Sequence, residues 1–94
     1  MDVFDVSLSR RAENDLKKLP EHIVLKLWSW VEAIHHEGLR SVRKLPGYHD
    51  EPLKGIRKRQ RSIRLSKAYR AIYRVDESSI PEIIEILEVT KHEY

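Results

Sequence analysis

Arginine side chains are concentrated in one short stretch of this chain. Six of them fall between positions 57 and 74, namely Arg57, Arg59, Arg61, Arg64, Arg70 and Arg74. Holding like charges close together costs free energy, so a protein that gathers guanidinium groups in this way commonly neutralises an anionic partner with them. The planar guanidinium binds phosphate oxygens in a bidentate manner, and phosphate is therefore the anion that we expect.

The net charge of +3 hides a strong asymmetry along the chain. Residues 1–39 carry a net charge of −2, residues 40–74 carry +10 and residues 75–94 carry −5. A surface that only keeps a protein soluble mixes both signs. The basic middle therefore favours a nucleic-acid surface, and a solvated basic face without a partner is the alternative.

Length and composition indicate one globular domain over residues 1–94. Hydrophobic residues make up 40% of the 94 residues and charged residues 35%, which is typical of a soluble protein with a single modest core. No apolar run is long enough to span a bilayer, and Asp2 and Asp5 stand where a signal peptide would be basic and then apolar. The absence of cysteine excludes disulfides and thiolate metal sites. We therefore expect a cytoplasmic protein that does not bind a membrane.

The first half of the chain predicts a strand and two helices. Apolar and polar residues alternate imperfectly over Asp2–Leu8, which indicates a strand. Ser9 can cap a helix that Pro20 ends. A second helix follows from Glu21, and Gly38 is its natural stop. Its two tryptophans, at positions 28 and 30, lie about 200° apart on a helix, so only one of them should face the sheet.

The second half predicts three strands. Leu39–Asp50 reads as an irregular basic connection. Ser62–Ser66 and Tyr69–Val75 are separated by only two residues, which predicts a tight antiparallel hairpin. The apolar-rich run Ile80–Lys91 predicts a last strand. The fold class is therefore α+β in the order β-α-α-β-β-β, with a four-stranded, largely antiparallel sheet packed on an N-terminal helical hairpin, and the other face of the sheet partly open and carrying the cations.

Three short motifs in this order resemble the RelE/ParE superfamily of bacterial toxins. They are the turn Glu51-Pro52-Leu53-Lys54-Gly55, the strand Tyr69–Val75 and the C-terminal Lys91-His92-Glu93-Tyr94. The resemblance covers nearly the whole chain and implies a RelE-like fold and the toxin half of a type II toxin–antitoxin system. The RelE-like branch, which the chain resembles best, consists of mRNA interferases that cut messages, most of them on the ribosome, without a metal or cofactor.

The resemblance also implies roles for individual residues. Arg70 matches the arginine that the family places on the scissile phosphate. Arg64 falls where one branch carries a lysine, but an arginine does not give up its proton and is a poor base. Glu51 matches a carboxylate that another branch uses as general base, although it could equally be a turn residue. His92 would donate or shuttle a proton, and Tyr94 would orient the 2′-OH or stack on a base.

The remaining cations and the partners follow from the same resemblance. The generic phosphate binders are Lys54, Arg57, Lys58, Arg59 and Arg61. The partners would be mRNA, ribosomal RNA and a cognate antitoxin, itself commonly a DNA-binding protein, so a toxin–antitoxin hetero-oligomer is expected.

Other interpretations remain open at this stage. The ParE-like branch of the superfamily poisons DNA gyrase and lacks the nuclease residues, and a non-catalytic RNA-binding module would show the same charge pattern. Arg70 and Arg74 could also serve only structure, by pairing with Glu85 and Glu88 on the neighbouring strand.

Overall fold

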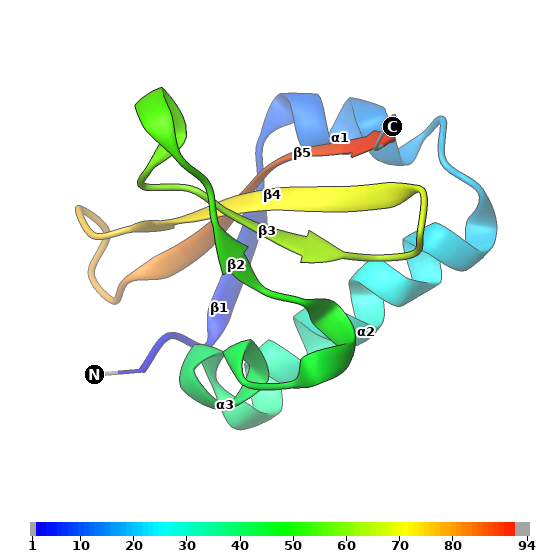
Figure 1. Cartoon of the computed structure of the whole chain (residues 1–94). Coiled ribbons are helices and arrows are strands. Elements are labelled where there is room, and N and C mark those ends of the chain that lie inside the picture. Colours follow the sequence, from blue (N-terminus) through cyan, green and yellow to red (C-terminus); the bar gives the residue numbers. More distant parts are fainter. Residues whose placement is uncertain (1, 92–94) are drawn as a thin grey trace.

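A single twisted sheet, covered on one face by the longest helix, forms the molecule (Figure 1). The structure is a computed structural model and describes residues 2–91. Its elements are β1 (Asp5–Leu8), α1 (Arg10–Leu16), α2 (Glu21–Glu37), α3 (Leu39–Arg43), the 3-10 turn η1 (Pro46–Tyr48), β2 (Glu51–Pro52), the 3-10 turn η2 (Gly55–Arg57), β3 (Arg61–Arg64), β4 (Tyr69–Asp76) and β5 (Ile83–Lys91).

The sheet has five strands in the order β1-β5-β4-β3-β2. β1 lies parallel to β5, and the other neighbours are antiparallel. The predicted α+β class and the antiparallel pairing of the β3–β4 hairpin are confirmed, but the predicted count of four strands is wrong. The additional strand, β2, has only two residues, which are too few to show the alternation by which a strand is recognised in a sequence.

Helix α1 protects the part of β5 that β1 does not reach. The predicted cap is present, since the Ser9 hydroxyl accepts a hydrogen bond from the backbone N–H of Ala12 at 3.0 Å. The same hydroxyl donates to the carbonyl of Leu87, and the Asp15 carboxylate accepts from the N–H of Val89. The free edge of β5 is thereby satisfied by side chains, which removes a template for aggregation.

Helix α2 ends at Gly38, as the sequence predicts, but the chain then forms a third helix. Gly38 has a φ of +83°, and a Cβ at this position would lie 2.3 Å from the Asp2 carboxylate. That carboxylate accepts from the N–H of Arg40 in the first turn of α3. The prediction of an irregular connection over 39–50 is therefore wrong for its first five residues, because a helix this short is fixed by this N-terminal contact and by burial of Leu39 and Val42 rather than by its own periodicity.

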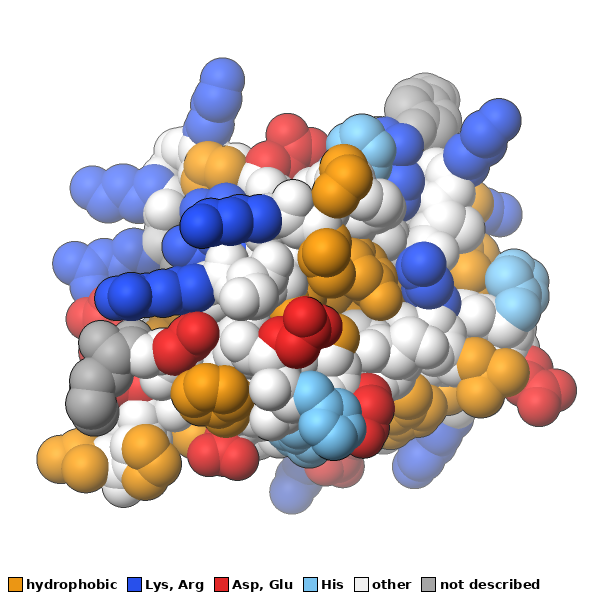
Figure 2. All heavy atoms as spheres, turned by 90° about the horizontal axis from the view of Figure 1, so that it is seen from below, with side chains coloured by type: hydrophobic (Ala, Val, Ile, Leu, Met, Phe, Trp, Pro, Cys, Tyr) orange, Lys and Arg blue, Asp and Glu red, His pale blue; other side chains and the backbone are white. Residues whose placement is uncertain are grey.

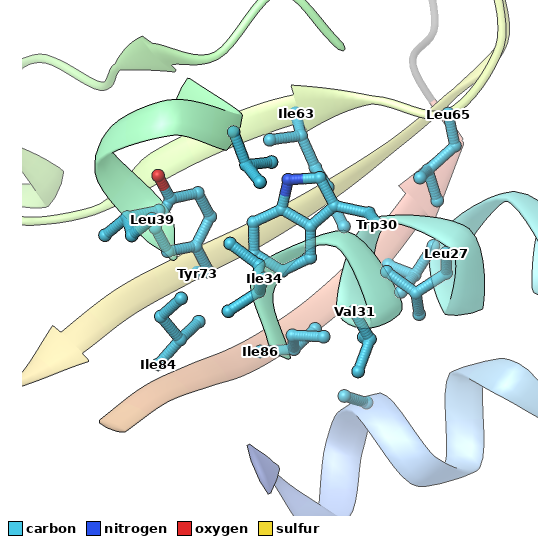
Figure 3. Packing of buried hydrophobic residues seen from close by; sticks show 14 of the residues in the cluster. Leu27, Trp30, Val31, Ile34, Leu39, Ile63, Leu65, Tyr73, Ile84 and Ile86 are labelled. Atoms are coloured by element: carbon cyan, nitrogen blue, oxygen red, sulfur yellow. The ribbon is translucent and has the colours of Figure 1, made fainter. Parts of the chain in front are cut away.

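The core lies between α2 and the sheet (Figure 3). Trp30 is fully buried, and its ring centroid lies 5.2 Å from that of Tyr73 on β4. Trp28 is 41% exposed, so only one tryptophan faces the sheet, as predicted. A bulge between β4 and β5 lets both Ile86 and Val89 face the core although they are three residues apart.

The β3–β4 hairpin has a slightly longer loop than predicted. Arg64 pairs with Arg70, and the N–H of Leu65 donates to the carbonyl of Tyr69 at 2.9 Å. Three residues then remain for the loop, and the Ser66 hydroxyl closes it by accepting from the N–H groups of Ala68 and Tyr69.

None of the described helices has the length and hydropathy needed to cross a membrane.

Candidate functional site

Two arginines face each other across the central hairpin. Arg64 on β3 and Arg70 on β4 are directly opposite in the register. Their neighbours Ile63 and Ala71 belong to the core, so the two arginines point to the face of the sheet away from α2. Like charges in this arrangement are destabilising. Arg64 forms no ion pair with any residue of the range 2–91, and Arg70 forms one, at 3.7 Å, with Glu51.

Glu51 reaches this face from the edge of the sheet. It pairs with Ser62 on β3, which places its side chain on the same face as the two arginines. Its side chain is 58% exposed and that of Arg70 is 24% exposed. Three of the predicted catalytic residues, Glu51, Arg64 and Arg70, are therefore brought together, and we call them the arginine pair site.

A buried carboxylate, which sequence reasoning missed, fixes the chain next to Glu51. The side chain of Asp50 is fully buried and accepts hydrogen bonds from Arg61 Nε and from the Tyr73 hydroxyl, each at 2.5 Å. Burial, together with the Asp50 charge, raises the pKa of Tyr73. Burial is the largest single influence on Arg61 and lowers its pKa, but the hydrogen bond to Asp50, the charge of Asp50 and the contribution of Tyr73 together outweigh burial and raise the pKa of Arg61. Asp50 thus holds β2 against β3 and β4, and Glu51, the next residue, points to the opposite face.

Arg57 covers the middle of the face that carries the arginine pair site. Its guanidinium donates to Gln60 at 2.7 Å and to Glu88 on β5 at 3.1 Å. To reach β5 it passes over the row formed by Ser62, Ile72 and Glu88, and this explains why Ser62 and Ile72 are buried on this face. The face is therefore only partly open, as predicted.

Arg74 has a structural role: it pairs with acidic residues of its own sheet. The sequence left this role open for both arginines of β4. It donates to Glu85 on β5 at 3.0 Å and lies 3.9 Å from Asp76. Arg70 contacts neither Glu85 nor Glu88 within the described range, and its partner is Glu51. The two arginines of β4 therefore differ in their ion-pair partners although they are four residues apart on the same strand.

The other predicted residues lie elsewhere. Lys54, Lys58 and Arg59 are exposed on the connection between β2 and β3, whereas Arg61 is bound internally by Asp50. His92 and Tyr94 lie outside the described residues.

Figure 2 shows Lys and Arg side chains gathered on the left, the side on which Figure 1 shows the β2–β3 connection and the β4–β5 turn. Within residues 2–91 no three His, Asp or Glu side chains form a group that could hold a metal ion.

Solved structures confirm the fold. The toxin–antitoxin complex RelBE2 from Mycobacterium tuberculosis contains a chain with 23% identity and a TM-score of 0.67, and the match covers 96% of this chain and 99% of that one. YafQ from Escherichia coli gives a TM-score of 0.73 at 17% identity, with 94% and 92% covered. The YoeB dimer from Staphylococcus aureus gives 0.69 at 22% identity, with 97% and 98% covered.

The family is established by the sequence rather than by these structures, whose low identities show the fold alone. No curated protein sequence matches the chain significantly. A family model described as the ParE toxin of the type II toxin–antitoxin system, parDE, matches residues 6–93. The chain therefore belongs to this toxin family, within the RelE/ParE superfamily, and is a toxin of a type II toxin–antitoxin system.

Proposed function

We propose that this toxin is an endoribonuclease that cleaves mRNA on the ribosome. The observation that carries the proposal is the arginine pair site, where Arg64 and Arg70 lie directly opposite each other and the exposed carboxylate of Glu51 lies 3.7 Å from Arg70. A like-charge pair directly opposite on neighbouring strands destabilises the fold, so stability does not explain its presence. A phosphodiester bound between the two guanidiniums would neutralise both, and the transition state of phosphoryl transfer would gain more from them than the ground state does.

The reaction needs a proton acceptor, a fixed cation and a proton donor. Glu51 takes the proton from the ribose 2′-OH, and the 2′-oxygen attacks the adjacent phosphorus in line. Arg70, with Arg64, stabilises the charge on the phosphorane oxygens. The bond from phosphorus to the 5′-oxygen then breaks, and that oxygen receives a proton. The products are a 2′,3′-cyclic phosphate and a 5′-hydroxyl, and DNA is not a substrate because it lacks the 2′-OH.

The proton for the leaving oxygen is assigned to His92, since histidine titrates nearest neutrality. Tyr94 would orient the 2′-OH or stack on a base. Both roles rest on the resemblance of the C-terminal motif to the RelE-like branch, because both residues lie outside the described part of the chain.

A cognate antitoxin is the second partner that we propose. The RelBE2 and DinJ–YafQ structures are toxin–antitoxin complexes. An acidic or amphipathic antitoxin segment would complement the +10 charge of residues 40–74. Such a segment would inhibit the toxin by occupying the arginine pair site.

The test is brief induced expression followed by mapping of 5′ RNA ends, with the wild type compared with Arg70→Ala. We expect new ends inside messages, bearing 5′-hydroxyl groups, in the wild type only. Purified protein should produce the same ends on translating ribosomes. Intact transcripts in both strains would contradict the proposal.

Gyrase inhibition is the second candidate, because the matching family model is that of the ParE toxin. A gyrase inhibitor would need neither His92 nor Tyr94, so alanine at either position would leave growth arrest intact. It would also induce DNA-damage signalling and block supercoiling by purified gyrase. Nuclease activity predicts the opposite result in all three measurements.

A further inference from the structure

A second cationic feature lies at the other end of the same strands. A hollow with a volume of about 600 Å³ is lined by residues from α3, β2, the β2–β3 connection, β3 and the end of β4. Its size falls within the range typical of small-molecule sites, roughly 300–1,000 Å³. Along β3 and β4 it lies three or four residues from the arginine pair site, but Pro52, Arg61, Tyr73 and Val75 are on the face that carries α2, opposite to the arginine pair site. We call this hollow the edge pocket.

The cations of the edge pocket are of two kinds. Arg61 and Arg74 are already neutralised, the first by Asp50 and the second by Glu85. The other three are Arg43, Lys58 and Arg59, all of them exposed. None of these three forms an ion pair with a carboxylate of the described residues, although Arg43 lies close to the Tyr73 hydroxyl. The fold does not neutralise these three charges itself, so the hollow that they surround attracts an anionic ligand.

The rest of the lining is not that of a simple anion site. Pro52, Tyr73 and Val75 contribute apolar surface next to the cations. Asp76 and Glu77 contribute carboxylates from the end of β4, and these repel a phosphate. A ligand that fits all three parts has a charged end and a flat, uncharged, hydrogen-bonding body, and this is the chemistry of a nucleotide.

We propose that the edge pocket binds one nucleotide of single-stranded RNA, with its phosphate on Arg43, Lys58 and Arg59 and its base over Pro52 and Val75. The inference rests on the proposed nuclease function for the identity of the polymer. A strand held at the arginine pair site would reach the edge pocket by passing round the β2 edge of the sheet, because Pro52 and Val75 are on the opposite face. The pocket adds a second point of attachment, which fixes the direction in which the RNA leaves the arginine pair site. Contact between a base and apolar side chains is tolerant of sequence, because every base has a π-face.

The test measures binding without cleavage, using a fluorescent 2′-O-methyl oligoribonucleotide, which has no 2′-OH to attack. The variants are Arg43→Ala, Lys58→Ala and Arg59→Ala, with Lys18→Ala as the matched control, since Lys18 is an exposed cation just after α1. Each pocket variant should weaken binding about threefold or more and should lower the slope of log K against log salt by about one. Lys18→Ala should change neither quantity.

A second measurement separates the pocket from the rest of the surface. In 15N-labelled protein, adenosine 5′-monophosphate should shift the amides of Tyr73 and Val75, and adenosine should shift them at higher concentration only. The proposal would be overturned if all three pocket variants kept the RNA affinity and the salt slope of the wild type. It would also be overturned if the pocket variants lost affinity for an acidic antitoxin peptide but not for RNA. The binding assay involves no cleavage, so it tests the pocket separately from the nuclease. If the wild type cuts no RNA but the pocket variants still weaken oligonucleotide binding, the nuclease proposal is contradicted and the pocket proposal is supported.

Discussion

Arg70 and Arg74 lie on one strand and face the same side of the sheet, yet their surroundings differ. Arg74 is opposite Glu85, donates to it at 3.0 Å and has Asp76 as a second partner. Arg70 is opposite Arg64 and Thr90, and its one carboxylate in the described chain is the exposed Glu51 at 3.7 Å. The first arrangement stabilises the hairpin, whereas the second opposes it.

The difference shows that two arginines on the same strand can have opposite effects on stability, and that the cross-strand partner decides which effect each one has. A site that must bind a transition state is commonly less stable than the scaffold around it. In this molecule the like-charge pair of Arg64 and Arg70 is at the loop end of the hairpin, where the exposed Glu51 pairs with Arg70 alone. At the opposite end Asp50 and Glu85 neutralise Arg61 and Arg74.

The largest expected effect is on catalysis at Arg70. Arg70→Gln removes the cation that faces the reacting phosphate, so the rate of mRNA cleavage on purified ribosomes should fall by a factor of about 100–1,000. Arg10→Gln is the matched control, because Arg10 is exposed on α1 and forms no ion pair among the described residues. Its rate should stay within about twofold of the wild type. Equal rates for Arg70→Gln and the wild type would mean that the uncompensated arginine has no catalytic role.

The next largest effect concerns the carboxylate that neutralises Arg61. Asp50→Ala leaves the Arg61 guanidinium and the buried Tyr73 hydroxyl without their acceptor. The free energy of unfolding should fall by about 2–3 kcal/mol, less than for a fully buried pair because Arg61 is partly exposed. Chemical denaturation checks this, with Asp5→Ala, an exposed position on β1, as the control. A loss for Asp50→Ala no larger than that of the control would show that the buried carboxylate does not hold β2.

The elements of this fold are predictable where local chemistry determines them. Ser9 and Gly38 mark helix boundaries by capping and positive φ, and the structure has boundaries at both. The sequence predicts that Pro20 ends the first helix, but that helix already ends at Leu16, and Pro20 instead lies directly before α2. By contrast, β2 and α3 are two and five residues long. They exist because Asp50 and Asp2 anchor them to distant segments, and such contacts leave no periodic pattern in the sequence.

The candidate site shows the same limit. Residue type and family motif predict Glu51, Arg64 and Arg70, and the structure brings these three together. The sequence does not distinguish Arg70 from Arg74, because cross-strand register decides which carboxylate each one meets. Asp50 was missed since a lone aspartate before a turn is ordinary, and only its burial between Arg61 and Tyr73 reveals its role.

A smaller effect should appear in the stability of the two arginine environments. Arg64→Gln removes a like-charge contact, so the free energy of unfolding should rise by about 0.2–1 kcal/mol. Arg74→Gln breaks the contact with Glu85 and should lower it by a similar amount. Urea titrations of both variants at low salt measure the difference. Changes of the same sign in both variants would remove the distinction between the two ends of the hairpin.

The smallest expected effect is the pH dependence of the turn after β4. Hydrogen bonds from the Ser78 hydroxyl and N–H, with a contribution from the charge of Arg74, lower the pKa of Asp76 below 3.8 in the folded protein. A carboxyl whose pKa is lower in the folded state than in the unfolded state stabilises the fold above its unfolded value. This contribution is therefore fully present at neutral pH and is lost as the pH falls below 3.8 and through the folded value.

Asp76→Asn should flatten the dependence of unfolding free energy on pH below about 4 while leaving the dependence between pH 6 and 8 unchanged. The exposed Glu77, which forms no ion pair in the described chain, is the control, and Glu77→Gln should leave the acid limb as in the wild type.

The same experiment in the Arg74→Gln background sharpens the contrast with Arg70. If Arg74 is a structural cation, its loss should reduce the acid-dependent step, because one of the charges that holds Asp76 ionised is gone. An acid limb that is identical in Arg74→Gln and the wild type would mean that the charge of Arg74 does not help to hold Asp76 ionised.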